Sequence, residues 1–491
     1  MKKNLQILLP VLVLATVACN KQIDDIRPLT KIDKNGELAS LAGIVETTVG
    51  NYALLNGSGF ATYDVSVQDL GESRGNNVTL QDWAPVSQTT DAFFFRNSTG
   101  ATAGNSAGLY RGAYQIIVSA NTTLEGIAAF QSSNFASLTV NDQNRLLYAK
   151  GENMFLRSFT YFNLVRVYGK PYYQNAGGNL SIPLKTSSDI KDVPAPATVK
   201  DMYAFIVTEL QTAAQLMKAP VAAPPTNAFA STAAAWALLS RVYLYMGGSI
   251  ASPDAGSNQK AAAYADSVIS QTGGLYALLQ GNAYQQMFGD DEFGNLGRSK
   301  FSTNPEIIFA RDNAAGGSSI GQLYHHDPNY GVGATFLPSS DLMQLFAPAD
   351  IRGTFFKLNV NDNHVETTKW LCLNQYVSTY APNIYFRLGE VYLSRAEAYA
   401  KLGNTAMARA DLKAIHTRAG LPASDIDNIP DQDLIGAVLK ERRMELAFEG
   451  HNSFDYFRNG LPMTRTAADN NGTAMTVQPD DPKVVFTIPN N

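Results

Sequence analysis

Apolar residues recur at intervals of three and four along the last quarter of the chain. One run covers residues 384–402 and a second covers 408–419, with Gly403 between them and Gly420 after them. This spacing puts the apolar side chains on one face of a helix, and glycine is favoured where a helix ends. The pattern therefore predicts two helices joined by a tight turn, which is the unit of a helical repeat.

The same pattern occurs in three earlier parts of the chain. Helix pairs are predicted at 155–169 with 202–217, at 235–247 with 259–270 and, from a weaker pattern, at 37–55 with 105–130. A helix with a seam of small residues, a turn and an alanine-rich second helix form the tetratricopeptide unit, and such units stack into solenoids. About four pairs predict a mainly α, right-handed solenoid of eight helices with insertions on one side.

Two long segments have a different character. Residues 56–104 and 272–383 are rich in Gly, Asn, Ser, Asp and aromatic residues and have no sustained helical period. Short β-prone runs occur at 306–310 and 355–360. We expect a large, irregular, loop-rich lobe with few short strands, carried on the helices. Loops positioned by a rigid frame usually carry the function of a protein.

The N-terminus predicts export and lipid anchoring. Lys2 and Lys3 precede an apolar run over residues 7–18, which ends in Ala18-Cys19. Twelve residues are too few to span a bilayer but fit the apolar part of a signal peptide. A small residue followed directly by Cys resembles a bacterial lipoprotein cleavage site, which implies removal of the preceding segment and a lipid on Cys19. The alternative is an ordinary secretory signal with an incidental Cys.

Composition excludes several classes of function. The 38 Lys and Arg against 43 Asp and Glu give a formal net charge of −5, whereas nucleic-acid binding needs a cationic surface. Five His and two Cys leave little for zinc or iron–sulfur chemistry, so no cofactor is predicted. Charged residues make up only 16% of the chain, and 23 Tyr are present. Such a surface suits neutral polar ligands.

Four segments resemble the SusD/RagB family. They are residues 157–169, 236–247, 385–399 and 441–450, and the last two have the sequences YFRLGEVYLSRAEAY and ERRMELAFEG. His451 stands where the family commonly has Arg. The resemblance covers nearly all of the chain that follows the signal peptide, in the family's order.

The resemblance implies a function without chemistry. Members of the family are outer-membrane lipoproteins of Bacteroidetes that bind nutrients, usually glycans, at the cell surface. They form a lid on a SusC-like TonB-dependent transporter. It implies this organisation: 1–18 signal peptide, 19–36 lipidated tether, 37–271 helical region with ligand-loop insertions, 272–383 irregular lobe, and 384–491 C-terminal helical region.

The ligand site is expected in the irregular lobe. Aromatic rings stack on the flat faces of sugars, and Asp, Asn and Arg bind the hydroxyl rims. Trp83 is the best candidate for a stacking ring, with Asp69, Arg74 and Asn76 as polar neighbours. Further candidates are Tyr324, Trp370 and Tyr376. The alternative is that Trp83 packs beneath its own loop.

An enzyme reading rests on carboxylates near the C-terminus. The residues Glu441, Glu445, Glu449 and Asp455 could supply a pair for glycoside hydrolysis. They alternate with Arg442, Arg443 and Arg458. Arg442 and Glu445 stand at the spacing of an ordinary helical ion pair, so ion pairs are preferred over catalysis.

Three parts of the sequence have residues of the types that bind metal ions. His325-His326-Asp327 could bind a metal, but a solvated loop is preferred, because adjacent side chains seldom converge on one ion. Residues 290–292 and 362–366 lack the spacing of a calcium loop and are predicted to be solvated turns. Three functional alternatives stay open beside glycan binding: a peptide or other non-sugar ligand, a scaffold without a small ligand, and a surface hydrolase.

Overall fold

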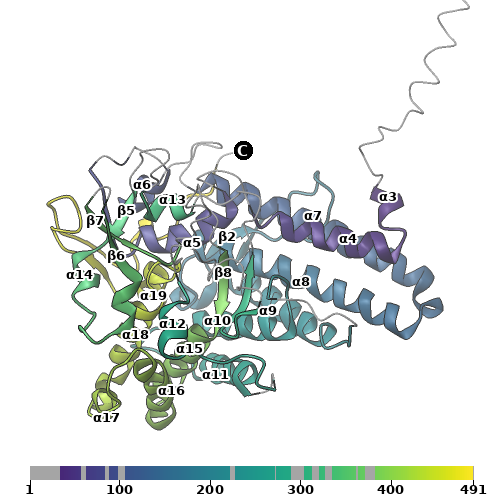
Figure 1. The fold of residues 1–491 in the computed structure, drawn as a ribbon. Helices are drawn as coiled ribbons and strands as arrows, with labels where there is room; N and C mark the ends of the chain where they lie inside the picture. Colours follow the sequence, from purple (N-terminus) through teal and green to yellow (C-terminus); the bar gives the residue numbers. More distant parts are fainter. Residues whose placement is uncertain are drawn as a thin grey trace, which may run out of the picture.

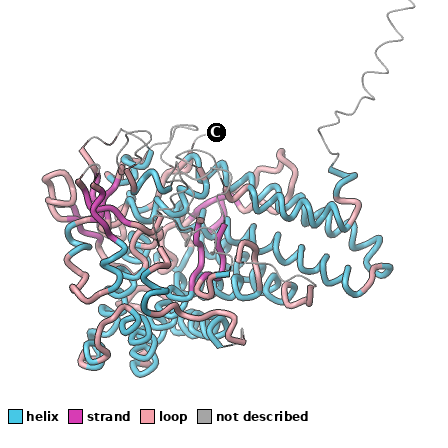
Figure 2. Tube along the Cα trace, in the orientation of Figure 1, coloured by secondary structure: helices cyan, strands magenta, loops and turns pink. Residues whose placement is uncertain are grey.

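The computed structural model describes most of the 491-residue chain. The described residues are 34–56, 62–82, 84, 88–97, 106–221, 227–270, 273–288, 303–311, 320–326, 334–360, 363–370 and 382–489. Cys19, Trp83 and Tyr376 lie outside them. Helices dominate the described part and the strands are short (Figure 2). None of its helices is both long and apolar enough to cross a membrane.

The helices stack one after another (Figure 1). From α7 onward, each of the following packs against the next. They are α7 Ala107–Asn134, α8 Val140–Tyr168, α9 Val199–Leu216, α10 Thr232–Met246, α11 Ala255–Ser270, α15 Leu388–Lys401, α16 Thr405–Arg418 and α18 Leu434–Glu445. Helix α4 (Leu41–Ala53) packs on α7 and α8. The predicted tetratricopeptide-like solenoid is confirmed, and α11 and α15 are neighbours although the irregular lobe separates them in sequence.

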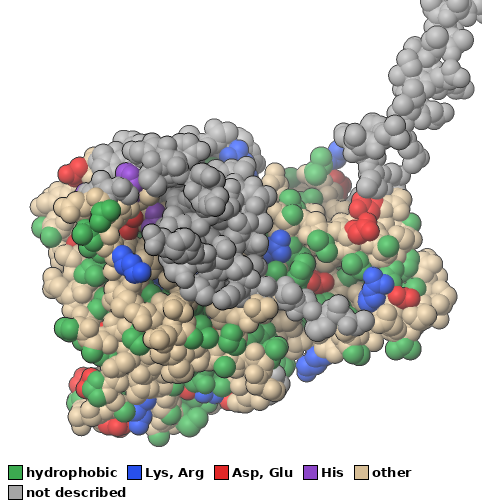
Figure 3. Space-filling view, viewed as in Figure 1, with side chains coloured by type: hydrophobic (Ala, Val, Ile, Leu, Met, Phe, Trp, Pro, Cys, Tyr) green, Lys and Arg blue, Asp and Glu red, His purple; other side chains and the backbone are tan. Residues whose placement is uncertain are grey.

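Shorter elements make up the rest. The remaining helices are α3 Lys34–Glu37, α5 Tyr63–Ser73, α6 Gln88–Phe93, α12 Gly281–Gln285, α13 Ile320–Tyr324, α14 Ser340–Met343, α17 Ser424–Asp427 and α19 Asn452–Arg458. The 3₁₀ helices are η1 Phe135–Ser137, η2 Gln174–Gly177, η4 Ile351–Phe355, η5 Asp431–Asp433 and η6 Pro482–Val484. On the face shown in Figure 3, charged side chains are scattered among uncharged ones, as the composition suggested.

The strands form antiparallel pairs. They are β1 Val78–Leu80 with β5 Phe336–Pro338, β2 Leu180–Pro183 with β3 Pro196–Thr198, β4 Ile307–Arg311 with β8 Asn383–Arg387, β6 Phe356–Asn359 with β7 His364–Thr367, and β9 Met463–Arg465 with β10 Met475–Val477. The β-prone runs at 306–310 and 355–360 coincide with β4 and β6. The helix expected from residue 384 begins at Leu388, because 383–387 pair with β4 as a strand instead.

Helix α5 was not expected, because residues 56–104 have no helical period. All of its residues are buried, so it has no polar face to alternate with an apolar one. Gly71 lies so close to the turn after α18 that an added Cβ would be 2.1 Å from the Gly450 carbonyl oxygen. A helix enclosed on every side carries no amphipathic signal, and its polar side chains find partners inside the protein.

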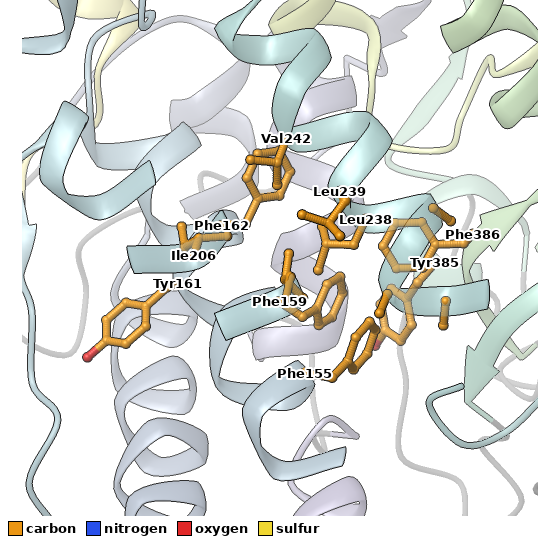
Figure 4. Close-up of a cluster of buried hydrophobic side chains, with 14 of the residues drawn as sticks. Phe155, Phe159, Tyr161, Phe162, Ile206, Leu238, Leu239, Val242, Tyr385 and Phe386 are labelled. Atoms are coloured by element: carbon orange, nitrogen blue, oxygen red, sulfur yellow. The ribbon is translucent and has the colours of Figure 1, made fainter. Parts of the chain in front are cut away.

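The main core joins the solenoid to the strand pair β4–β8 (Figure 4). Phe155 and Phe159 of α8 point toward Tyr385 of β8, with Phe159 and Tyr385 ring centroids 5.0 Å apart. Phe309 of β4 meets Phe155 edge-on at 5.3 Å. Leu238 of α10 contributes to the same cluster. The strand pair is thereby packed against α8 and α10 and gives the irregular lobe a fixed base.

A buried ion cluster also ties the irregular lobe to the C-terminal helices. Its members are Glu306, Asp350, Arg352, Lys369, Arg387, Arg418, Glu441, Glu445 and Glu449. Arg418 of α16 bonds to Glu306 of the lobe at 2.7 Å. Arg387 contacts both Glu445 and Glu449. Taking charges out of water is costly, so each member depends on its partners being in place.

Removing Glu445 is expected to destabilise the fold strongly. Glu445→Ala leaves Arg387 and Arg418 buried with fewer partners, which should cost about 3–5 kcal/mol. A lower melting temperature and a lower denaturant midpoint would register the loss. The control is Asp427→Ala, which breaks an exposed 2.8 Å pair with Lys413 and should cost about 0–1 kcal/mol. Equal effects of the two substitutions would contradict the structural role of the cluster.

Candidate functional site

Asp69 lies on α5 and is buried. The Tyr324 hydroxyl donates to its carboxylate over 3.5 Å. The neighbouring Glu72 accepts backbone N–H bonds from Phe448 at 2.8 Å and Gly450 at 3.1 Å. Burial, and after it the Glu72 carboxylate, raise the pKa of Asp69 to about 8. The Asp69 carboxyl is thus predominantly protonated at neutral pH, inside the packed region beneath the irregular lobe.

Arg74 follows α5 and holds the C-terminal segment. Its guanidinium donates to the carbonyl oxygens of Lys483 at 2.8 Å and Val484 at 3.1 Å. The group also lies 3.3 Å from the ring centroid of Phe486. Burial and then Arg465 keep the pKa of Arg74 well below its usual range. The sequence predicted a ligand contact here, whereas the structure uses the side chain to fix the chain's own end.

Asn76 joins α5 and β1 to α19. Its backbone N–H donates to the side chain of Asn452 at 2.6 Å. Its amide Nδ2 donates to the Tyr456 hydroxyl and to the Thr464 carbonyl, each at 3.1 Å. The residue is only 6% exposed. These bonds give Asn76 a structural role in this arrangement.

Tyr324 and Trp370 support the turn after α18. The Tyr324 ring meets Phe448 edge-on at 5.0 Å, and Trp370 Nε1 donates to the Phe448 carbonyl at 2.8 Å. Phe448 has a φ of 66°, a left-handed conformation that needs outside support. Tyr324 is 1% exposed and Trp370 2%, so neither presents an open ring face.

The structure therefore corrects one part of the site expectation. Asp69, Arg74, Asn76, Tyr324 and Trp370 are buried and bonded within the protein, so they do not line an open surface as it stands. The amino-acid composition of a segment does not distinguish polar residues on a buried helix from polar residues on a ligand-binding loop. Trp83 and Tyr376 fall outside the described residues and stay predictions.

The carboxylates of the hydrolase alternative are held in ion pairs. The expected pairing of Arg442 with Glu445 is wrong, because Arg442 Nε instead bonds to Asp455 Oδ2 at 2.8 Å. Burial alone would raise the pKa of Glu445, but the Arg418, Arg387 and Arg352 guanidiniums hold it well below the usual value. A carboxylate so held is a poor proton donor to a leaving group.

His325 of the histidine motif is buried rather than solvated, and His326 is half-buried. His325 is 2% exposed, and its Nδ1 lies 3.5 Å from Glu366 Oε2. His326 donates its backbone N–H to the other oxygen of Glu366 at 2.9 Å. The turn expected at 362–366 is largely strand β7, while residues 290–292 and Asp327 lie outside the described part. Within the described residues, no group of three His, Cys, Asp or Glu is placed to hold a metal ion.

An open groove lies on the outer side of α18. It has a volume of about 580 Å³, and Ile435, Leu439, Tyr456 and Leu461 are among the residues that line it. Lys440 is among the charged residues that line it. Ile435 and Leu439 stand one helical turn apart, which is a signal that the sequence does contain. The groove is separate from the residues that the sequence predicted for the ligand.

Comparison with known proteins identifies the family. Residues 39–244 match the family model described as "Starch-binding associating with outer membrane", and residues 357–491 match the model described as "SusD family". The chain belongs to the SusD/RagB family. No curated protein matches it.

Solved structures of SusD-superfamily proteins have the same fold. One from Bacteroides thetaiotaomicron is 24% identical with a TM-score of 0.76, covering 92% of this chain and 96% of that one. Another, from Bacteroides vulgatus, is 25% identical with a TM-score of 0.75 and the same coverage. A SusD-like carbohydrate binding protein from Bacteroides vulgatus is 20% identical with a TM-score of 0.69, covering 92% and 93%.

The pKa of Asp69 predicts a pH-dependent stability. An unfolded Asp releases its proton near pH 3.8, whereas folded Asp69 keeps it up to about pH 8. Stability from this group is therefore complete at low pH and falls as pH rises from 4 to 8. Asp69→Asn, which resembles the protonated form, should remove the part of the fall that Asp69 contributes and stabilise the protein at pH 8 by on the order of 1–3 kcal/mol.

Melting temperatures at half-unit steps from pH 4 to 9 measure this effect. The exposed Asp480→Asn is the control and should keep the wild-type profile. A profile of Asp69→Asn parallel to the wild type would show that the carboxyl is ionised in the folded protein.

Proposed function

We propose that this protein is a cell-surface, lipid-anchored nutrient-binding protein that takes an oligosaccharide and acts as a lid for a SusC-like TonB-dependent transporter. The match of residues 39–244 to the model described as "Starch-binding associating with outer membrane" carries this proposal. The second match, over residues 357–491, extends the family to the C-terminal end of the chain.

Binding without catalysis is supported by the state of the acidic residues. Glu441 and Glu449 are buried against Arg352 and Arg387 respectively. Burial raises the pKa of each carboxyl, but Arg352 for Glu441 and Arg387 for Glu449 outweigh it and lower the pKa. A glycosidase needs one carboxylic acid that keeps its proton near neutral pH and a partner carboxylate across the sugar. Glu441 and Glu449 are buried and ionised, so neither is suited to protonate the leaving group of a glycoside.

The proposed ligand site lies in the irregular lobe, with Trp83 as the stacking ring. Strand β1, which ends three residues earlier, is paired with β5. Gln81 extends the pairing by donating its N–H to the Thr335 carbonyl at 3.1 Å, and Ala84 N–H bonds back to the Gln81 carbonyl at 3.0 Å. Residues on both sides of Trp83 in sequence are thus tied to the frame that would carry the proposed site.

Trp83→Ala is expected to weaken glycan binding and leave the melting temperature unchanged. Loss of a stacking ring should cost about 1–3 kcal/mol of binding, as it does at other aromatic platforms. A glycan array followed by calorimetry on the chain from residue 20 onward measures it. Trp236→Ala is the matched control, because Trp236 packs on the helical core and should affect melting but not binding.

Two outcomes would redirect the site proposal. A large fall in melting temperature for Trp83→Ala would place its ring in the core. Absence of glycan binding by the wild type, together with binding of peptides, would change the cargo and leave the family role intact.

Anchoring is proposed to depend on Cys19. Its support is the apolar segment at 7–18 that ends directly before it. Cys19→Ala should release the protein from the outer membrane, since a lipid is then the only membrane anchor in the proposal. Cell fractionation in a strain lacking the transporter tests this, with Cys372→Ala as the matched control. Retention of the Cys19 variant in the outer membrane would rule out the lipid anchor.

The transporter interface is proposed to be large, roughly 2,000 Å² or more, because a lid must stay attached while its ligand is exchanged. The solenoid is suited to supply most of it, since stacked helices give extended and rigid surfaces.

A further inference from the structure

A small cavity lies beside the C-terminal segment of the chain. Its wall includes the end of α8 and the turn that follows, part of α19, and Val484 and Phe486 near the C-terminus. The cavity has a volume of about 30 Å³, which is room for about two water molecules or one monatomic ion. No acidic residue in the described part of the chain lines it. The charged residues of its wall are all basic, namely Arg74, Arg166, Lys170 and Arg458.

One of these basic groups is already neutralised by acidic side chains. Arg458 bonds to Glu397 and to Asp455, each at 2.6 Å. Those carboxylates also serve other cations, because Lys401 lies 3.2 Å from Glu397 and Arg442 lies 2.8 Å from Asp455. Two carboxylates are thus shared among three cations, so they leave no negative charge for a further guanidinium.

Arg74 and Arg166 have no carboxylate partner among the described residues. The Nη atoms of Arg74 donate to backbone carbonyls and to the Asn97 side chain, and Arg166 Nη2 donates to the Val67 carbonyl at 3.3 Å. All of these acceptors are neutral. The Nε of each arginine makes no hydrogen bond within the part of the chain that the structure describes. Two guanidiniums on one cavity wall therefore lack a counter-charge and part of their hydrogen bonding.

The excess of positive charge also affects the groups around it. Burial lowers the pKa of Arg74 and of Arg166. His451 is 6% exposed, and burial followed by the charges of Arg241, Arg442 and Arg166 holds its pKa well below the usual value. A neutral His451 adds no further positive charge, but it supplies no negative charge either.

We propose that the cavity binds a monovalent anion of halide size, such as chloride, in contact with Arg74 and Arg166. Buried charges are normally paired, and a buried donor without a partner points to water or an ion at the site. Water could accept a hydrogen bond from either Nε, but it would leave both positive charges uncompensated. The volume favours a monatomic anion over phosphate or sulfate, whose four oxygen atoms need more room.

Such an anion would also fasten the C-terminal segment to the solenoid. Arg74 already holds carbonyl oxygens of this segment, and the Phe486 N–H donates to the Val167 carbonyl of α8 at 3.0 Å. An anion bound to both Arg74 and Arg166 of α8 would join the same two parts of the fold. Anion binding should therefore stabilise the folded chain, because the unfolded chain has no such site.

The chloride dependence of thermal stability tests this inference on the chain from residue 20 onward. Sodium chloride is compared with sodium gluconate at equal ionic strength, because gluconate is too large for the cavity. We expect the melting temperature to rise with chloride along a single-site saturation curve, by about 2 °C at a hundredfold excess over Kd. No rise, or a rise that does not saturate, would overturn the inference.

Two substitutions on α8 locate the effect. Arg166→Met should abolish the chloride dependence, because it removes one of the two guanidiniums proposed to bind the anion. Arg145→Met is the matched control and should keep the wild-type dependence, since Arg145 lies on the same helix in an exposed 3.4 Å pair with Asp142. An unchanged chloride response of Arg166→Met would refute this site.

Bromide in crystals of the wild-type chain gives a measurement that does not depend on the folding of a variant. Bromide is a halide whose anomalous scattering reveals its position. We expect an anomalous peak in the cavity beside the Nε atoms of Arg74 and Arg166. Bromide at the protein surface only, with none in this cavity, would show that water satisfies the two arginines and would overturn the inference.

Discussion

The carboxylate of Glu445 meets the guanidiniums of Arg352, Arg387 and Arg418 from three separate elements, and the position of the irregular lobe depends on these contacts. Arg387 ends the strand that pairs with β4, and Arg418 ends α16. Arg418 also reaches Glu306, which precedes β4. Water cannot reach these charged groups where they lie. The folded positions of the lobe, the strand pair and the last helices are therefore stable only when all three are in place. Aromatic packing between α8 and β8 also stabilises the lobe against the solenoid. The buried charges add a stricter requirement, because each charged group is stable only when its partner element is in place.

Sequence periodicity predicted the solenoid from apolar residues at helical spacing, both in helices with one more exposed face such as α9 and in α10, which is almost wholly buried. It failed for α5, which is enclosed on all sides and satisfies its polar groups internally, as Glu72 does with the backbone at Phe448 and Gly450. Periodicity also placed the start of α15 too early, since the apolar residues Tyr385 and Phe386 fit a buried strand as well as a helix. Periodicity detects apolar residues at helical spacing, and the two errors occur where a buried helix is largely polar and where a strand is largely apolar.

The candidate site was harder to predict than the fold for a related reason. Arg74, Asn76 and Trp370 belong to residue types that bind sugars, and here the same hydrogen-bonding groups fasten the protein's own turns and C-terminal segment. A donor that caps a backbone carbonyl and a donor that meets a ligand hydroxyl are identical in sequence. Distinguishing them requires the position of each neighbour, and for Arg74 those neighbours lie some four hundred residues away in the chain.

The irregular lobe separates in sequence two helices that pack against each other. Helix α11 ends at Ser270, and its neighbour α15 begins only at Leu388. Contacts between segments so distant in sequence form slowly, because the entropy of closing a long loop is lost before the contacts stabilise the chain. Helices α7 to α11 each pack on the next one in sequence and can form those contacts earlier. Until that late closing step, the helices on either side of the irregular lobe lack their final neighbours, so the two ends of the solenoid become one structure only when the whole chain has folded.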